Sequence, residues 1–422
     1  MAPAERRNRV SLGANFSKLL TAATISSTGD GVTFIAAPLL AATITRDPRQ
    51  IAGIETALAL PWLLFSLPAG ALVDRWDRRK VLWIVDAFRC GITAVLAIAT
   101  AAEVVTMPML YLTFFLLGTG QVFFDNADQA FLPQVVASDG LERANARLQS
   151  ATLGSGQLFG PAFGSLLFGV TASLPFAFDA GTFAAASLLA FTIQGSFTTH
   201  NPAAPVIRPT LRSDIAEGWR YLTRHRLLRR LAIVLGLLNL FDLIARATFV
   251  LYAQDRLHLS KLGFGVVLTM GAVGGIIGGI AADRMGSRRP KTILAIVVAV
   301  MGISHALIPT FTTAIIAGVA FAINGGMSVL WNVVTVSARQ QIIPTNLFAR
   351  VNSVYRLLAW GTMPIGAFLG GFIANRYGLA APFWVASAGH GLLIIAAVAW
   401  LSTDNIDAAR AESDAMAKDT MQ

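Results

Sequence analysis

The sequence predicts an all-α membrane protein in which twelve transmembrane helices form two six-helix pseudo-repeats around a central cavity. Of its 422 residues, 55% are hydrophobic and 13% are charged, whereas roughly 25% are charged in a typical soluble domain. The apolar residues form long continuous runs, and a charged loop between two runs has a second copy in the other half of the chain. So few charges could not cover two or three soluble domains, and a lipid environment removes that need.

The apolar runs are long enough to cross a bilayer. A helix of about 20 residues crosses roughly 30 Å of hydrocarbon, and continuous hydrophobicity excludes the alternating strands of a membrane barrel. The first run follows Arg6, Arg7 and Arg9 but is too long for a signal-peptide core, so we expect it to be retained. The runs lie at about 15–45, 51–73, 80–101, 107–132, 148–170 and 175–195, and then at about 230–253, 262–282, 291–309, 313–337, 354–376 and 380–401.

Basic residues are unequally distributed between the loops. Twenty-six of the 33 Lys and Arg residues lie before the first run, in alternate loops or in the tail, while five lie on the opposite face and two lie inside runs. The positive-inside rule therefore predicts a multi-pass protein of the cytoplasmic (inner) membrane with cytoplasmic N- and C-termini. Because the basic residues mark topology, the net charge of +10 does not indicate nucleic acid as a partner.

These features divide the chain into five segments, two of them six-helix bundles. The tail is polar and expected to be disordered. The predicted segments are 1–14 (cytoplasmic N-terminal segment), 15–195 (N-terminal bundle), 196–229 (cytoplasmic linker), 230–401 (C-terminal bundle) and 402–422 (cytoplasmic tail).

The linker contains a predicted amphipathic helix that begins at Ser213. Ile215, Trp219 and Leu222 form its apolar stripe, and three arginines lie beside that stripe. We expect this helix to lie on the cytoplasmic membrane surface as a tether between the bundles, with a regulatory role as the alternative.

Two loop motifs recur at nearly the same offset. The loop Gly70–Lys80 has an echo 209 residues later, which begins at Gly279. A second motif, which includes Arg143, recurs 207 residues later around Arg350. Two independent motifs at nearly one offset indicate parallel six-helix repeats, an architecture that places the substrate site between the halves.

The six-plus-six arrangement and its acidic–basic loop resemble the major facilitator superfamily over residues 15–401. The family's loop has glycine, three residues, aspartate and a basic residue, followed by glycine and two basic residues. Here Asp77 replaces the second glycine, and the remaining motif residues are Gly70, Asp74, Arg75, Arg78 and Arg79. The resemblance implies that these five residues form a conformational latch that holds the outward-open state, while the alternative is that the basic residues only fix topology.

The second copy of the loop is weaker. It retains Gly286, Asp283 and Arg284 but has Ser287 at a basic position. We therefore expect the first copy to be the working latch and the second to orient helices.

Finer features are similar to the branch of exporters that contains macrolide-efflux and enterobactin-export proteins. They include the Gly29–Gly31 stretch around Asp30, Asp86 with Arg89, and Glu217 with Gly218. The fifth run resembles the antiporter motif of drug–proton exchangers in Gly156, Gly160, Pro161 and Gly164, but Ser165 replaces a glycine of the pattern. These glycines also form a face for close helix packing, and Pro161 can bend the helix.

The resemblance implies alternating-access export of hydrophobic or amphipathic small molecules, such as drugs, antibiotics or siderophore-like compounds, by proton antiport. An importer or facilitator of a small metabolite is the alternative among transporters. From another class, a membrane-embedded enzyme or a receptor would need a convergent catalytic set or an output domain, and the sequence has neither.

Ionisable residues inside apolar runs are costly, so each is a functional candidate. Asp30 lies roughly 14–15 residues into the first run, or about 21 Å along a helix. It is the first candidate for carrying the proton, with a structural ion pair as the alternative. Asp242 and Arg246 are four residues apart and can pair on one helical face. Arg246 could instead face Asp30 across the cavity, and protonation of Asp30 would then release that pair.

Further polar and aromatic residues are candidates for the substrate cavity. Asp125 and Asp128 either attract a cationic substrate or are simply hydrated. Asp86 with Arg89 is expected to be a structural pair, Asp179 is expected to be structural, and the two intramembrane histidines are expected to pack. The candidate cavity residues are Gln121, Phe124, Asp125, Asp128, Asn239, Trp331 and Asn332.

Several kinds of chemistry lack their signature in the sequence. No Gly-x-x-x-x-Gly-Lys-Ser/Thr loop is present. Cys90 is the only cysteine, which excludes an internal disulfide and a multi-cysteine metal site. We therefore expect no enzymatic activity, no cofactor and no metal. The expected partners are the small-molecule substrate, protons and membrane lipid, and the protein is expected to be a monomer.

Overall fold

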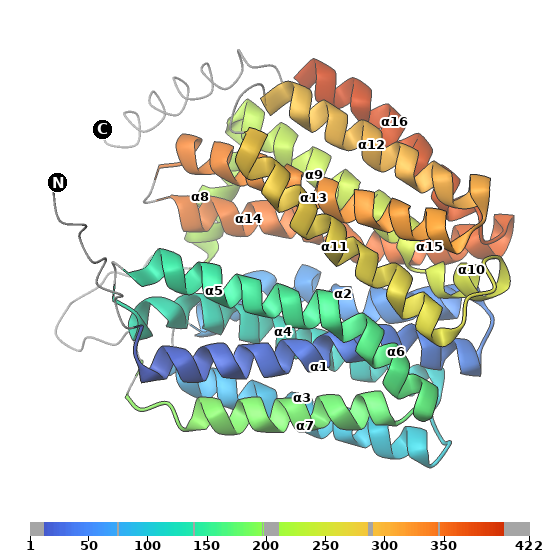
Figure 1. Cartoon of the computed structure of the whole chain (residues 1–422). Helices are drawn as coiled ribbons and strands as arrows, with labels where there is room; N and C mark the ends of the chain where they lie inside the picture. The colour runs from blue at the N-terminus through green and yellow to red at the C-terminus, as the bar shows by residue number, and fades with distance from the viewer. Residues whose placement is uncertain are drawn as a thin grey trace, which may run out of the picture.

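The computed structural model describes residues 12–73, 76–137, 140–195, 197, 211–285, 290–344 and 347–400. Every regular element in these ranges is helical (Figure 1). The first half contains α1 (Ala14–Ile44), α2 (Pro48–Val73), α3 (Arg78–Ala101), α4 (Met107–Val135), α5 (Leu141–Leu153), the π-helix η2 (Gly154–Phe159), α6 (Gly160–Val170) and α7 (Leu174–Phe191). The second contains α8 (Leu211–Arg224), α9 (Arg226–Arg246), α10 (Phe249–Asp255), α11 (Lys261–Met285), α12 (Pro290–Phe311), α13 (Ala314–Ile342), α14 (Phe348–Trp360), α15 (Met363–Tyr377) and α16 (Ala381–Trp400).

The prediction of an all-α membrane protein is confirmed. In the described part of the chain, 10 helices are long and apolar enough to cross a membrane. The other two predicted spans correspond to α16 and to the segmented α5–η2–α6, which starts at Leu141 and thus earlier than the expected 148. The chain is therefore an integral, multi-pass membrane protein.

Local sequence explains where several helices begin. Proline occupies the first turn of α2, α4 and α7, where its missing N–H leaves no hydrogen bond unmade. The Asp77 carboxylate caps α3 by accepting hydrogen bonds from the backbone N–H groups of Arg79 and Lys80. Asp77 replaces a glycine of the family loop, and in this protein it serves as a helix cap.

Three spans are interrupted near their middle. The fifth changes to a π-helix from Gly154, the seventh breaks between Arg246 and Phe249, and the eleventh breaks between Trp360 and Met363. Gly154 and Gly361 are 207 residues apart, which is the offset of the duplicated loops. Interrupted helices at corresponding positions of two repeats are typical of transporter binding sites.

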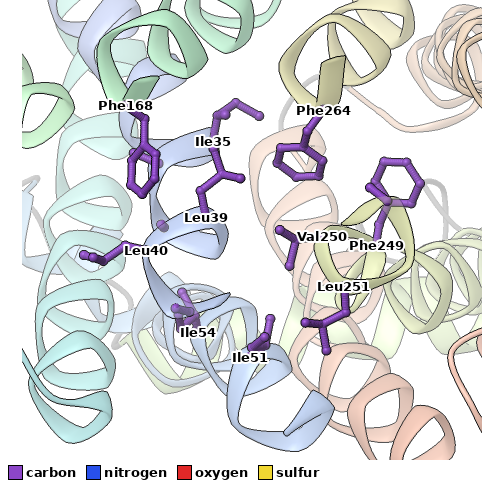
Figure 2. Packing of buried hydrophobic residues seen from close by; sticks show 14 of the residues in the cluster. Ile35, Leu39, Leu40, Ile51, Ile54, Phe168, Phe249, Val250, Leu251 and Phe264 are labelled. Atoms are coloured by element: carbon purple, nitrogen blue, oxygen red, sulfur yellow. The ribbon is translucent and has the colours of Figure 1, made fainter. Parts of the chain in front are cut away.

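The two halves share one hydrophobic core at one end of the molecule. Figure 2 shows Ile35, Ile51 and Phe168 of the first half facing Val250, Leu251 and other side chains of the second. We call this end the sealed end, and the opposite end, where α1 begins, the basic end. There the cores are separate: one cluster draws on α1–α5 and α7, and another on α8, α9, α11–α14 and α16. The halves therefore close on each other at the sealed end and diverge towards the basic end (Figure 1).

The linker helix α8 packs on the second half. Gly218 lies so close to the backbone of Arg350 in α14 that a Cβ atom would overlap with it. Glu217 forms an ion pair with Arg350, and Leu222 is buried in the core of the second half. Trp219 remains exposed. The helix is thus docked on α14, a contact that the membrane-surface interpretation did not include.

Two predicted segments fall largely outside the described residues. These are the N-terminal segment 1–14, of which residues 12–14 are described, and the tail 402–422. The predicted boundaries 15–195, 196–229 and 230–401 stay predictions.

Candidate functional site

Arg89 is the centre of an ionic cluster in the first half. Its Nη2 donates hydrogen bonds to Oδ1 of Asp30 on α1 at 2.5 Å and to Oε1 of Gln121 on α4 at 2.7 Å. Gln121 in turn donates to Asp125 Oδ1 at 2.7 Å. On its own helix, Arg89 lies 3.7 Å from Asp86. These five residues are the N-terminal ionic cluster, which ties α1, α3 and α4 together.

The Asp30–Arg89 pair combines an accessible carboxylate with a buried guanidinium. The Arg89 side chain is 3% exposed and that of Asp30 is 39% exposed. The guanidinium is shielded by the Phe183 ring, whose centroid lies 4.1 Å away, and more loosely by Phe124 at 5.9 Å. Asp30 therefore combines a permanently charged partner with an accessible face.

The position of Arg89 differs from the prediction. The expected pair with Asp86 exists, but the shorter bond of Arg89 goes to Asp30 on another helix. The alternative in which Asp30 faces Arg246 is not observed, because Arg246 lies against other carboxylates. Spacing along one helix could not reveal a partner on a neighbouring one. The available signal was that Arg89 is one of two arginines inside a run.

A second polar cluster lies in the other half. The Asp242 carboxylate on α9 is 3.8 Å from Arg246 Nε and 3.8 Å from Nε2 of His305 on α12. The His305 ring stacks on that of His390 on α16, with centroids 5.0 Å apart. The two histidines were expected only to pack. They pack against each other, and His305 also faces Asp242. Asp242, Arg246, His305 and His390 form the C-terminal ionic cluster.

Arg246 connects this cluster to the first half. It is the last residue of α9, at the break in the seventh span, where a cation complements the carbonyl end of the helix. Its Nη2 lies 4.0 Å from Glu55 on α2, and its guanidinium lies 5.3 Å from the Phe34 ring centroid on α1. Glu55 was not among the predicted site residues, although it is an acidic residue inside an apolar run.

Arg356 forms a further contact between the halves. Its guanidinium lies 4.4 Å from the Trp360 ring centroid and 5.5 Å from that of Trp62 on α2. The two indoles meet edge to face at 4.5 Å. Arg356 also donates to Gln129 on α4 at 3.3 Å and interacts electrostatically with Asp125. This aromatic–cationic group was missed because its members lie in three distant parts of the sequence, on α2, α4 and α14.

The antiporter motif packs the fifth span against α1 beside Asp30. A Cβ on Gly160 would lie 2.6 Å from the Cα of Gly31, and one on Gly164 would lie 2.7 Å from the carbonyl oxygen of Val32. A Cβ on Gly156 would lie 2.9 Å from the Ser27 carbonyl oxygen. Pro161 occupies the first turn of α6, directly after the π-helix. The motif thus fixes the backbone at the turn of α1 that carries Asp30.

The described part of the predicted latch binds the first half together. Arg78 donates to the carbonyl oxygen of Ala130 on α4 at 3.1 Å, and Arg79 donates to that of Ile193, just after α7, at 2.6 Å. Gly70 lies next to Asn126, at a distance that would leave room for a Cβ. Asp74 and Arg75 lie outside the described residues. In the second copy, Arg284 is exposed at the end of α11, and the side chain of Asp283 is not described.

The remaining cavity candidates lie in different environments. Asn239 donates to the carbonyl oxygen of Ala359 at 2.7 Å and so joins α9 to α14. Asn332 is exposed and Asp128 is half-buried. Trp331 is 2% exposed and packs in the core of the second half, so the prediction that it lines the cavity is wrong for this conformation.

Asp179 on α7 lies beside the N-terminal ionic cluster. It is 1% exposed, and it accepts hydrogen bonds from Thr33 at 2.6 Å and Thr182 at 3.2 Å. A Cβ on Gly29 would overlap with its carboxylate. The Thr33 bond joins α7 to α1 one turn after Asp30.

A family model described as "Transmembrane secretion effector" matches residues 12–422. The chain is 28% identical over 396 residues to the multidrug efflux pump Tap of Mycolicibacterium fortuitum, with 90% of this chain and 94% of that protein covered. It is 26% identical to macrolide efflux protein A of Streptococcus pyogenes, with 80% and 84% covered. It is also 26% identical to the enterobactin exporter EntS of Shigella boydii, with 90% and 89% covered.

Solved structures share the fold. A crystal structure of a mutant of the nucleoside transporter NupG has a TM-score of 0.75 at 12% identity, with 92% of this chain and 100% of that chain covered. A bacterial homologue of the iron transporter ferroportin in the inward-facing state has a TM-score of 0.71 at 16% identity, with 92% and 98% covered. At such low identity the likeness concerns the fold alone.

Proposed function

Because the chain belongs to the transmembrane secretion effector family of major facilitator transporters, we propose that it exports hydrophobic or amphipathic organic molecules from the cytoplasm in exchange for protons. Family membership confirms the resemblance stated from the loop motifs, and the relatives confirm the efflux branch. The chain is a secondary transporter that exports small molecules. The class of substrate and the use of protons are the proposal.

The Asp30–Arg89 bond is the observation that carries proton coupling. Asp30 is an exposed carboxylate on a buried guanidinium, at mid-length of α1. When Asp30 binds a proton, its negative charge is lost and its bond to Arg89 weakens. Arg89 then relies on Gln121 and Asp86, and α1 is freed from α3 and α4. Since α1 also packs on the fifth span through the antiporter motif, a proton at Asp30 favours movement of both helices.

Substrate binding is assigned to the space between the halves, near the interrupted spans. Trp62, Trp360 and Arg356 offer aromatic faces and a cation, and Asp125 offers an anion. An amphipathic molecule with an aromatic ring finds both stacking and ionic partners there. Gln121, Phe124 and Asp128 on α4 and Asn239 on α9 complete the proposed lining, while Asn332 on α13 is assigned to its rim.

The loop after α2 is proposed to act as the latch. Arg78 and Arg79 fasten the start of α3 to α4 and to the segment after α7. Asp74 and Arg75 would supply the remaining charges of this network, with Asp283 and Arg284 as its weaker counterpart. As the family resemblance implies, the latch would hold the outward-open state and release as the halves rock.

We place the protein in the cytoplasmic membrane as a monomer surrounded by lipid, with the basic end and both termini in the cytoplasm. The loop charges support this orientation. We propose that the chain acts by transport alone, without enzymatic activity and without a cofactor.

The test uses everted membrane vesicles from a host that lacks its own ethidium pumps. With respiration providing the proton gradient, wild-type vesicles should accumulate ethidium, and an uncoupler should abolish the accumulation. Asp30→Asn should lower the initial rate about tenfold or more, equivalent to about 1.4 kcal/mol, and Asp30→Glu should restore part of it. The matched control is Glu103→Gln, at an exposed loop carboxylate. Uncoupler-sensitive accumulation at the wild-type rate by Asp30→Asn would remove Asp30 from the coupling mechanism.

A further inference from the structure

The tautomers of the two buried histidines are fixed by backbone carbonyl groups. His305 Nδ1 lies 2.8 Å from the Met301 carbonyl oxygen, and His390 Nδ1 lies 2.7 Å from that of Ala386. A carbonyl oxygen only accepts, so both Nδ1 atoms donate. A neutral imidazole has a single N–H, and Nε2 of each ring is then an acceptor without a proton.

His305 Nε2 faces another acceptor. The Asp242 Oδ1 atom lies 3.8 Å away, and when the histidine is neutral and the aspartate is ionised no proton lies between them. A proton placed between these two atoms binds to His305 Nε2 and is attracted by the Asp242 carboxylate. The Nε2 atom of His390 is buried and has no hydrogen-bond partner among the described residues. Because the rings are stacked at 5.0 Å, two imidazolium ions would repel each other, and the pair accepts one proton.

The charges around this position are few. In the described chain, α9 contributes Asp242 and Arg246, α16 contributes His390, and α2 of the other half contributes Glu55. From α13, Asn324 donates a hydrogen bond to Ser304, the neighbour of His305 in the sequence, and carries no charge. Asp242 is therefore the one carboxylate in contact with His305, and Arg246 competes with His305 for it.

We propose that His305 and Asp242 form a second proton-binding site, which lies in the C-terminal half. Proton binding at this site changes the contact of Arg246 with Glu55, and this contact joins the two halves. A proton on His305 Nε2 gives an imidazolium paired with Asp242. Arg246 then loses part of its attraction to Asp242 and relies more on Glu55 and on the Phe34 ring. Release of the proton returns Arg246 to Asp242 and weakens this contact between the halves.

The role of this proton in transport rests on the proposed antiport, but the proton site itself does not. Two measurements separate these statements. The first reads the proton directly by nitrogen-15 NMR of histidine-labelled full-length protein in lipid nanodiscs, and the second measures transport.

In the NMR measurement, the resonances of His305 are identified by their loss in His305→Gln. Should that variant not fold, they are identified by exclusion with variants at the other histidines. On acidification, the His305 signals should change from the neutral Nδ1–H form to the imidazolium. In Asp242→Asn, which removes the facing carboxylate, the imidazolium form should be less populated than in wild-type protein under the same conditions. A neutral Nε2–H form, or an imidazolium population indifferent to Asp242→Asn, would overturn the proton site.

The transport measurement uses proteoliposomes and ethidium in two modes. Counterflow exchanges substrate without net proton movement, whereas uptake driven by an imposed pH gradient requires it. His305→Gln should keep counterflow and lose about tenfold or more of gradient-driven uptake, equivalent to about 1.4 kcal/mol. The matched control His258→Gln, at an exposed loop residue, should keep both.

The two proposals fail differently. If wild-type protein shows counterflow but no response to the pH gradient, the antiport is wrong and the NMR result alone decides the proton site. If wild-type protein is gradient-driven and His305→Gln is equally so, the antiport stands and the coupling through His305 is wrong. Glu55→Gln should resemble His305→Gln, because it removes the acceptor on the other half.

Discussion

The two ionic clusters occupy equivalent helices of the two repeats but differ in their basic residue. In the first half, Asp30 on the first span pairs with Arg89 on the third. In the second half, Asp242 on the seventh span faces His305 on the ninth. The sixth and twelfth spans contribute one further buried ionisable residue each, Asp179 and His390. On the third span of its repeat, one half thus holds a permanent cation, whereas the other half holds on the equivalent ninth span a side chain that is a cation only when a proton is bound.

The distances follow the same division. Arg89 and Asp30 are 2.5 Å apart, while the contacts of Asp242 with His305 and Arg246 are both 3.8 Å. A short charge-assisted bond holds helices together, whereas a loose contact costs little to rearrange. We infer that the first cluster holds the helices of its half together and that the contacts of the second cluster rearrange.

The largest expected effect comes from removing the permanent cation. Arg89→Gln leaves Asp86, 2% exposed, without a cationic partner, and loss of one member of a buried pair costs about 3–5 kcal/mol. The free energy of unfolding in detergent should fall by that order, and export should be lost. His305→Gln, the equivalent change in the other half, should cost clearly less. Equal losses of stability would contradict this difference between the two clusters.

An intermediate effect is expected for a close glycine contact between helices that both halves contain. Gly160 and Gly164 pack on the α1 backbone, and Gly366 and Gly370 of α15 pack on α9 at Leu240 and Ile244 in the same way. Gly160→Ala and Gly366→Ala should each destabilise the protein by about 1–3 kcal/mol, because a Cβ overlaps with a backbone. Thermal unfolding measures this.

The control for the glycine contacts is Gly169→Ala, where no atom lies within 4 Å of the added Cβ. That change should be neutral or slightly stabilising, since alanine favours a helix. A loss at Gly160 without one at Gly366 would show that the close contact matters in one half only.

The smallest effect concerns two helix caps. Asp47 Oδ1 accepts from the backbone N–H of Arg49 at the start of α2, whereas the Ser260 hydroxyl accepts from that of Gly263 at the start of α11. Hydrogen bonds from Arg49 hold the pKa of the Asp47 carboxyl below its ordinary value of 3.8. The ionised cap therefore stabilises the protein above about pH 4, and this contribution is lost as the pH falls through the lowered pKa.

The cap at Asp47 contributes less than about 1 kcal/mol, because it is exposed. Asp47→Asn keeps the cap without the titration, so the stability of the variant relative to wild-type protein should rise on acidification. The relative stability of Ser260→Ala should not vary with pH over the same interval. A constant difference between wild-type protein and Asp47→Asn from neutral pH to about pH 3 would contradict the ionic cap.

The fold was predictable because its signals are local or repeated. Continuous apolar runs predict membrane helices whatever their neighbours are, and the offset of 207 residues identified the repeats. The interruptions were harder to predict. Nothing in the spacing around Gly154 indicates a π-helix, because that conformation depends on the packing of the fifth span against α1.

The site was predictable only as a set of costly residues. Asp30, Asp242 and Arg246 stand out because charge is rare inside a span. Asp242 and Arg246 do meet on one helix. Arg89 and His305, however, contact Asp30 and Asp242 from other helices, so both were assigned to local pairing or packing. The prediction that Trp331 lines the cavity was wrong for a related reason. Helix α13 carries apolar residues on every side, and its sequence does not show which face is buried.

The shared core at the sealed end has a further consequence for the resting protein. The side chains that form this shared core are apolar, so separating them transfers apolar surface to water with a positive heat-capacity change. Hydrophobic stabilisation weakens on cooling. Cooling is therefore expected to weaken the apolar contribution to the closure of this end.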